Sequence, residues 1–116
     1  MTHTVTAHAP VRPRYRCRDD LSFLERRGRG AAGRRPFDHW AVRSTGNYGI
    51  DCRVGAMMAR DLRHYLTDTH DVCILHDIIF DLMARGADPG GEGLVVGFCT
   101  EIAMDLLRAE RPEGWQ

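Results

Sequence analysis

The stretch DCRVGAMMARDLRHYL, residues 51–66, carries the clearest structural signal in this chain. Its apolar side chains recur every three or four residues, which places them on one face of an α-helix: Val54, Met58, Leu62, Tyr65 and Leu66. Gly55 and Ala59 lie four residues apart on one edge of that face, and small residues there let a second helix approach closely. We therefore predict a helix over residues 51–66 that packs against a neighbour.

Two further helices are predicted downstream. The segment TDTHD, residues 67–71, offers Asp68 or Thr69 as the cap of a helix over about 69–85. A third helix spans about 94–109, because the apolar face of LVVGF, residues 94–98, continues unbroken into the rest of the segment. The β-branched residues of 94–98 would also suit a strand. Short loops between the three elements predict an all-α fold, a small antiparallel three-helix bundle.

The middle segment, HDVCILHDIIFDL at residues 70–82, mixes histidine, cysteine and aspartate with apolar residues. On a helical wheel of about 100° per residue its polar wedge is narrow and holds only His70, Asp77 and Asp81. A helix that is apolar nearly all round is buried on most sides. We therefore expect this helix to be the central one of the bundle.

The chain divides by charge near residue 36. All 16 basic residues are arginines; residues 1–36 hold nine of them and three acids, whereas residues 37–116 hold seven and thirteen acids. The net charge of zero thus combines a basic arm with a mildly acidic helical body. The arm is predicted to be largely irregular, with a short helix over residues 19–27 that begins at its two aspartates and docks through Leu21 and Leu24.

The segment between arm and helices has little periodicity. Residues 37–45, FDHWAVRST, alternate poorly, so we interpret them as irregular chain that Phe37 and Trp40 anchor to the core. In TGNYGID, residues 45–51, Asn47 or Asp51 is expected to cap the first helix.

A metal site would draw on His70, Cys73 and Asp77, which follow one another at steps of three and four residues. A structural zinc site needs four ligands, mostly in paired spacings. The other candidate ligands are single residues, Cys52, His64 and Cys99. We expect no metal and no cofactor, and keep a small metalloprotein built on this trio as an alternative.

Catalytic residues are scarce as well. The only serines, Ser22 and Ser44, lie in arm or loop sequence, and a Cys73–His76 dyad would sit on a buried helix, where cysteine is usually inert. Without a convergent acid, base and nucleophile we expect that the chain is not an enzyme.

The arginine arm is the predicted partner-binding region, together with exposed aromatics. Arginines that alternate with an aromatic could follow a phosphate backbone, grip an acidic protein, or lie along the chain's own Asp71, Asp77 and Asp81. The candidate contact residues are Arg12, Arg14, Tyr15, Arg16, Arg18, Arg26, Arg27, Arg29, Trp40 and Tyr48.

The chain is expected to be cytoplasmic. No apolar run approaches the roughly 18 residues of a membrane span, and MTHTVTAHAPVRPR lacks the apolar region of a signal peptide, so no membrane contact is predicted. A homodimer through Gly55 and Ala59 is conceivable, although packing within the chain is the commoner use of such a pair.

Three segments together resemble a family: NYGIDCRVGAMMARDL at 47–62, LHDIIFDLMARG at 75–86 and GLVVGFCTEIAMDLL at 93–107. Residues 46–109 are similar to small accessory proteins of proteobacterial phages, plasmids and integrated elements. The resemblance implies a helical body and brings no catalytic residues. Proteins of this size on mobile elements are often inhibitors that bind a host machine, anti-CRISPR proteins included.

We therefore expect a non-enzymatic protein-binding inhibitor or adaptor from a bacterial mobile element, whose partner is a host or element-encoded protein. The alternatives are an accessory protein that binds nucleic acid through the arm, and the small metalloprotein.

Overall fold

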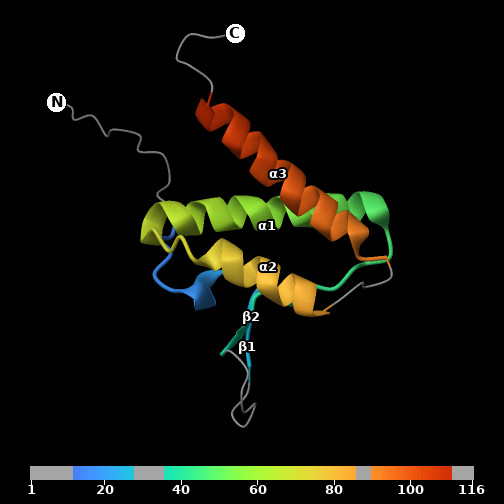
Figure 1. Ribbon diagram of the computed structural model, residues 1–116, viewed down its shortest axis with the longest axis horizontal. Helices are drawn as coiled ribbons and strands as arrows, with labels where there is room; N and C mark the ends of the chain where they lie inside the picture. The colour runs from blue at the N-terminus through green and yellow to red at the C-terminus, as the bar shows by residue number, and fades with distance from the viewer. Residues whose placement is uncertain (1–11, 28–35, 86–89, 111–116) are drawn as a thin grey trace, which may run out of the picture.

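The computed structural model describes residues 12–27, 36–85 and 90–110. Three helices dominate the described chain: α1 (Tyr48–Thr69), α2 (Ile74–Arg85) and α3 (Glu92–Glu110). A 3-10 turn, η1 (Arg18–Asp20), and two short strands, β1 (Glu25–Arg26) and β2 (Phe37–Asp38), precede them (Figure 1). The three predicted helices are confirmed, residues 94–98 are helical, and the small sheet departs from a purely α fold.

The tightest packing in the molecule is between α1 and α3. Glycine makes it feasible: a Cβ on Gly55 would fall 2.1 Å from the backbone oxygen of Leu94, and a Cβ on Gly97 would fall 1.9 Å from the backbone oxygen of Cys52. The two backbones therefore touch where any side chain would keep them apart. Gly55 is thus used within the chain, as is Ala59, which is buried in the core.

The prediction that residues 70–83 form the central helix is wrong. α1 packs against α3, whereas α2 lies beside them and covers much less of either helix (Figure 1). Ile74 and Ile78 are fully buried, but Val72 is 79% exposed and Met83 is 75% exposed. Much of the apolar surface that led to the prediction of burial therefore faces solvent, as at Ile79 and Phe80.

The boundary between α1 and α2 differs most from the prediction, since α1 ends at Thr69 and α2 begins at Ile74. Asn47 caps α1 as expected, since its side chain accepts a hydrogen bond from the backbone nitrogen of Ile50 at 2.9 Å. The expected start signal at Asp68 and Thr69 instead lies inside α1. His70 ends that helix with φ 57°, in the left-handed region, and its backbone N–H donates to the oxygen of Leu66.

The N-terminal segment packs on the helices and completes the core. Leu21 docks as predicted, together with Phe23, whose ring meets that of Phe98 edge-on at 6.3 Å. The predicted helix over residues 19–27 is wrong: the 3-10 turn ends at Asp20 and the chain then extends into β1. Because a two-residue strand has no periodicity to detect, only its antiparallel partner, Phe37–Asp38, reveals it.

The division into a basic arm and a helical body stays an interpretation. Residues on the N-terminal side of the charge boundary share one core with Trp40 and Phe98. None of the helices in the described part of the chain is long and apolar enough to cross a bilayer.

Candidate functional site

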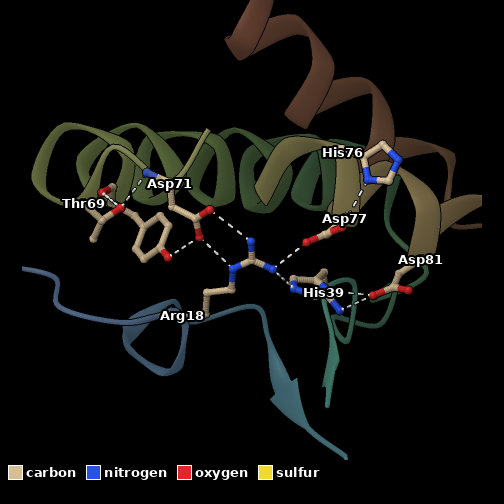
Figure 2. Close-up of polar contacts among 8 residues, drawn as sticks. Arg18, His39, Thr69, Asp71, His76, Asp77 and Asp81 are labelled. Atoms are coloured by element: carbon tan, nitrogen blue, oxygen red, sulfur yellow. Dashed lines mark hydrogen bonds and ion pairs between the residues drawn. The ribbon is translucent and has the colours of Figure 1, made fainter. Parts of the chain in front are cut away.

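One arginine joins the N-terminal segment to the helical body. Arg18 Nε and Nη2 donate to the two carboxylate oxygens of Asp71 at 2.7 and 3.1 Å, and Nη1 donates to Asp77 at 2.7 Å (Figure 2). Tyr65 adds a hydrogen bond from its hydroxyl to Asp71 at 2.6 Å. The fork of the guanidinium thus spans the turn before α2 and the first turn of α2 itself, a bidentate geometry that lysine cannot reproduce.

His39 extends this cluster into the core. Its Nε2 lies 2.9 Å from Arg18 Nη1, and its Nδ1 lies 2.7 Å from Asp81 Oδ2, which also accepts the backbone N–H of His39 at 3.0 Å. Arginine can only donate, so Nε2 accepts and the ring proton sits on Nδ1. His39 and Asp81 are both buried, and within the described residues every buried side-chain polar atom has a hydrogen-bond partner.

A second anchor lies on α1. Arg12 holds Asp68 with two bonds of 2.7 Å, and the same carboxylate accepts the backbone N–H of Tyr15 at 2.9 Å. The Tyr15 hydroxyl donates to Asp61, which also accepts the backbone N–H and the hydroxyl of Ser22. Asp61 and Asp68 are seven residues apart, two turns along one face of α1, so the N-terminal segment is fastened along that face.

These contacts shift the pKa values of the side chains that make them. The bonds from Arg12 and from the backbone of Tyr15 lower the pKa of Asp68 to about 2. The bond from Arg18 lowers the pKa of Asp71, while the bond to Asp71 raises that of Arg18. Burial, and then the hydrogen bond to Asp61, raises the pKa of Tyr15 to about 12. The shifts of Asp68, Asp71 and Arg18 favour the charged forms that hold the docked segment near neutral pH, whereas the shift of Tyr15 keeps its hydroxyl protonated.

The arginines predicted to contact a partner are therefore largely occupied inside the chain. Arg12 binds Asp68, and Arg18 binds Asp71 and Asp77. Contacts of the arm with Asp71, Asp77 and Asp81 of the same chain were one of the alternatives in the sequence analysis, and Arg18 confirms it for the first two.

The arginines at the end of β1 and just after it are also engaged. Arg26 pairs with Asp19 at 2.5 Å and lies over the ring of Phe37 at 4.9 Å, and Arg27 lies 4.0 Å from Asp81, the third aspartate of that interpretation.

The remaining predicted contact residues are scattered. Arg14 and Arg16 are exposed on the N-terminal segment, and Arg29 lies outside the described residues. Trp40 is only 3% exposed, because its ring packs edge-on against Phe98 at 5.2 Å, so it anchors the core and offers no surface to a partner. Tyr48, at the start of α1, is 59% exposed.

The trio named for a metal site does not come together. Among the described residues no three histidine, cysteine or acidic side chains are placed to hold one ion. Asp77 is bonded to Arg18, His70 is the C-terminal cap of α1, and the Cys73 thiol is exposed at the turn before α2.

An apolar groove opens between α2 and α3. Its hollow of about 240 Å³ is lined by apolar side chains and the Cys99 thiol: Leu75, Ile78, Ile79, Leu82, Phe98, Ile102, Ala103 and Leu106. A neighbouring hollow of about 420 Å³ shares Leu75, Ile102 and Leu106 and adds Leu62 and Leu66 of α1. We refer to the two together as the α2–α3 groove.

Large apolar side chains continue beyond both edges of this groove. Met83 lies one turn past Ile79 on α2 and is 75% exposed. Leu107 lies one turn past Ala103 on α3, and it and Leu106 are 68% and 65% exposed. Isolated exposed apolar residues are ordinary, whereas large contiguous apolar patches are typical of interaction sites in general.

Sequence reasoning missed the groove for a specific reason. It assigned these residues to the interior of the bundle, because the helical pattern of a buried face and that of an uncovered face are the same. It also missed His39, Asp61 and Asp68 as anchors of the N-terminal segment. The surplus of acids in the body, thirteen against seven arginines, was the one signal that pointed toward such pairing.

Comparison with protein-family models, with curated proteins and with solved structures found no match to this chain.

Proposed function

We propose that this protein acts by binding another protein, as an inhibitor or adaptor, and that the α2–α3 groove is the surface that binds. The observation that carries the proposal is the hollow between α2 and α3 within this groove, which faces solvent and is lined by apolar side chains and the Cys99 thiol. The neighbouring hollow adds the polar side chains of Arg63, Thr67 and Asp105 at its edge. Exposure of apolar surface to water is unfavourable. Complete burial of one Leu, Ile or Met side chain in an interface stabilises a complex by about 1.5–3 kcal/mol.

The shape of the groove defines the kind of ligand. It runs between two helices and offers no ring of polar groups to orient a small polar molecule. The apolar stripe of an amphipathic helix fits such a site, with anchors three and four residues apart. The partner expected from the resemblance, a host or element-encoded protein, would present this type of helix.

Binding by the arm fits the geometry less well. Arg12, Arg18 and Arg26 already bind carboxylates of the same chain. A nucleic acid would have to compete with those pairs or rely on Arg14 and Arg16. The nucleic-acid alternative therefore stays a prediction that no contact in the described structure favours.

Position-specific cross-linking tests the proposal. A photo-reactive amino acid replaces Ile79 in the groove, and a control protein carries it at Met57, an apolar and more exposed position on α1 outside the groove. Both proteins are irradiated in bacterial cells. We expect a discrete protein adduct from position 79 that Leu106→Asp removes, and none from position 57.

The identity of the adduct is read by mass spectrometry, which separates a second copy of this chain from a different protein. The same products from both positions, or no protein adduct from position 79, would overturn the groove as the binding surface.

A further inference from the structure

We infer that the N-terminal segment, residues 12–27, regulates the α2–α3 groove: its docking through Arg18 holds α2 at the distance from α3 that gives the groove its binding form. The inference rests on the proposed function, because it concerns the surface that binds the partner there. It follows from the way α2 is attached to the rest of the molecule, which differs from the way α3 is attached.

The polar attachments of α2 follow one stripe along the helix. Three side chains at successive intervals of four residues form it, from the first turn of α2 to the last: Asp77, Asp81 and Arg85. Asp77 accepts from Arg18 at 2.7 Å, and Asp81 accepts from the ring and the backbone of His39 at 2.7 and 3.0 Å (Figure 2). Arg85 donates to the backbone oxygen of Trp40 at 2.5 Å. Every one of these bonds joins α2 to chain that precedes α1.

The groove is lined by a different face of the same helix. Leu75, Ile79 and Leu82 form that face, roughly 120° around the helix axis from the polar stripe. The buried Ile74 and Ile78 also attach α2 to the core, but apolar contacts are non-directional, whereas hydrogen bonds have preferred angles. The polar stripe therefore orients α2, and movement of the stripe moves the wall of the groove with it.

The opposite wall does not depend on the N-terminal segment. α3 approaches α1 through backbone contacts at Gly55 and Gly97. Two ion pairs also join these helices, Arg60 with Glu101 at 3.6 Å and Arg63 with Asp105 at 2.9 Å. α1 and α3 thus form one unit, and release of the segment would change the position of α2 alone.

Arg18 is the attachment that can be released. Its side chain and those of Asp71 and Asp77 are partly exposed, so water can replace these bonds, whereas His39 and Asp81 are buried. A wall that is already in place lowers the cost of ordering the site when a ligand binds. Docking of the segment and binding in the groove should therefore stabilise each other.

Distances between spin labels test this coupling in the full chain. Labels on non-natural amino acids at positions 83 of α2 and 107 of α3, one turn past the groove lining, report the width of the groove. Labels at positions 57 of α1 and 104 of α3 report the crossing of those two helices. All four positions are exposed, and the native cysteines stay in place.

Arg18→Met should broaden the 83–107 distance distribution, measured by double electron–electron resonance, and shift it to longer distances. The 57–104 distribution should stay as in wild type, which shows that the variant keeps its fold. Arg16→Met, at a neighbouring exposed position, should leave both distributions unchanged. Arg18→Lys keeps the charge without the bidentate fork and should give an intermediate width.

Binding in the groove is measured with the same variants. In the cross-linking experiment, Arg18→Met should lower the yield of the protein adduct from position 79, whereas Arg16→Met should not. Equal amounts of folded protein are compared, so that a loss of stability does not count as a loss of binding.

An 83–107 distribution that Arg18→Met leaves as in wild type would overturn the inference. Equal broadening of both label pairs would also overturn it, because the whole helical unit would then have loosened, and so would an unchanged adduct yield. If Arg18→Met does not fold, Arg18→Lys is judged by the same criteria. Absence of any adduct from position 79 in wild type removes the proposed function, and the distances alone then decide whether the segment positions α2.

Discussion

Gly97 of α3 lies against Cys52 of α1 so closely that a Cβ on the glycine would fall 1.9 Å from the cysteine's carbonyl oxygen. Gly55 makes the reciprocal contact with Leu94. Gly93 of α3 also lies close to α1, because a Cβ there would fall 2.8 Å from the backbone oxygen of Tyr48. Three glycines, one on α1 and two on α3, therefore allow the two helices to cross.

Gly97→Ala should destabilise the fold by about 1–3 kcal/mol or more, because neither backbone can yield without separating the helices. Gly49→Ala is the control: its Cβ would meet only Asn47 Oδ1, at an ordinary 3.5 Å, so stability should be unchanged or up to about 1 kcal/mol higher. Urea unfolding followed by circular dichroism measures both variants. Equal stability of the two would show that the helices do not cross at Gly97.

The three helices could be predicted because apolar spacing is a local property of the sequence. The close approach could be predicted from Gly55 on one helix, but its partner could not, since Gly97 carries no periodic signal of its own. The position of α2 was predicted wrongly for a related reason. Met83 and Leu106 have the spacing of core residues, and only the arrangement of the helices shows that they are uncovered.

The N-terminal segment shows how far its polar contacts could be predicted from the sequence. The sequence pointed to Asp71 and Asp77 as acceptors for arm arginines, and the structure confirms both. It could not select Arg18 from an arm in which every second residue from 12 to 18 is an arginine. That choice depends on where the chain turns after Cys17, which is set by packing of Leu21 in the core.

Arg18→Met should destabilise the protein by roughly 1–3 kcal/mol, because it leaves the Asp71 and Asp77 carboxylates without their main partner. The cost stays below that of a fully buried pair, since these carboxylates still reach solvent. Arg16→Met, at a neighbouring exposed position, should change stability little. Thermal unfolding compares the two, and a similar melting temperature for both variants would contradict the role given to Arg18.

Asp68 should titrate far below an ordinary aspartate. Arg12 holds its pKa at about 2, against an ordinary value of 3.8. Because the pKa is lower in the folded chain, this contact stabilises the docked segment fully above about pH 4 and is lost as the pH falls toward 2. Carboxyl ¹³C NMR measures the titration directly.

Arg12→Gln should move the pKa of Asp68 back toward 3.8, while Arg16→Gln should leave it in place. If Asp68 titrates near 3.8 in the wild-type chain, the bond between Arg12 and Asp68 does not form in solution.

His39 should be a single tautomer with its proton on Nδ1. Nε2 lies 2.9 Å from Arg18 Nη1, which can only donate, and Nδ1 lies 2.7 Å from the Asp81 carboxylate, which can only accept when ionised. Long-range ¹H–¹⁵N spectra distinguish the two ring nitrogens, and the exposed His76 ring in the same spectrum serves as the internal control. Arg18→Met should leave the proton on Nδ1, because Asp81 still accepts it, and should shift only the Nε2 resonance. A wild-type ring protonated on Nε2 would mean that Arg18 does not reach His39 and that the cluster around it is arranged differently.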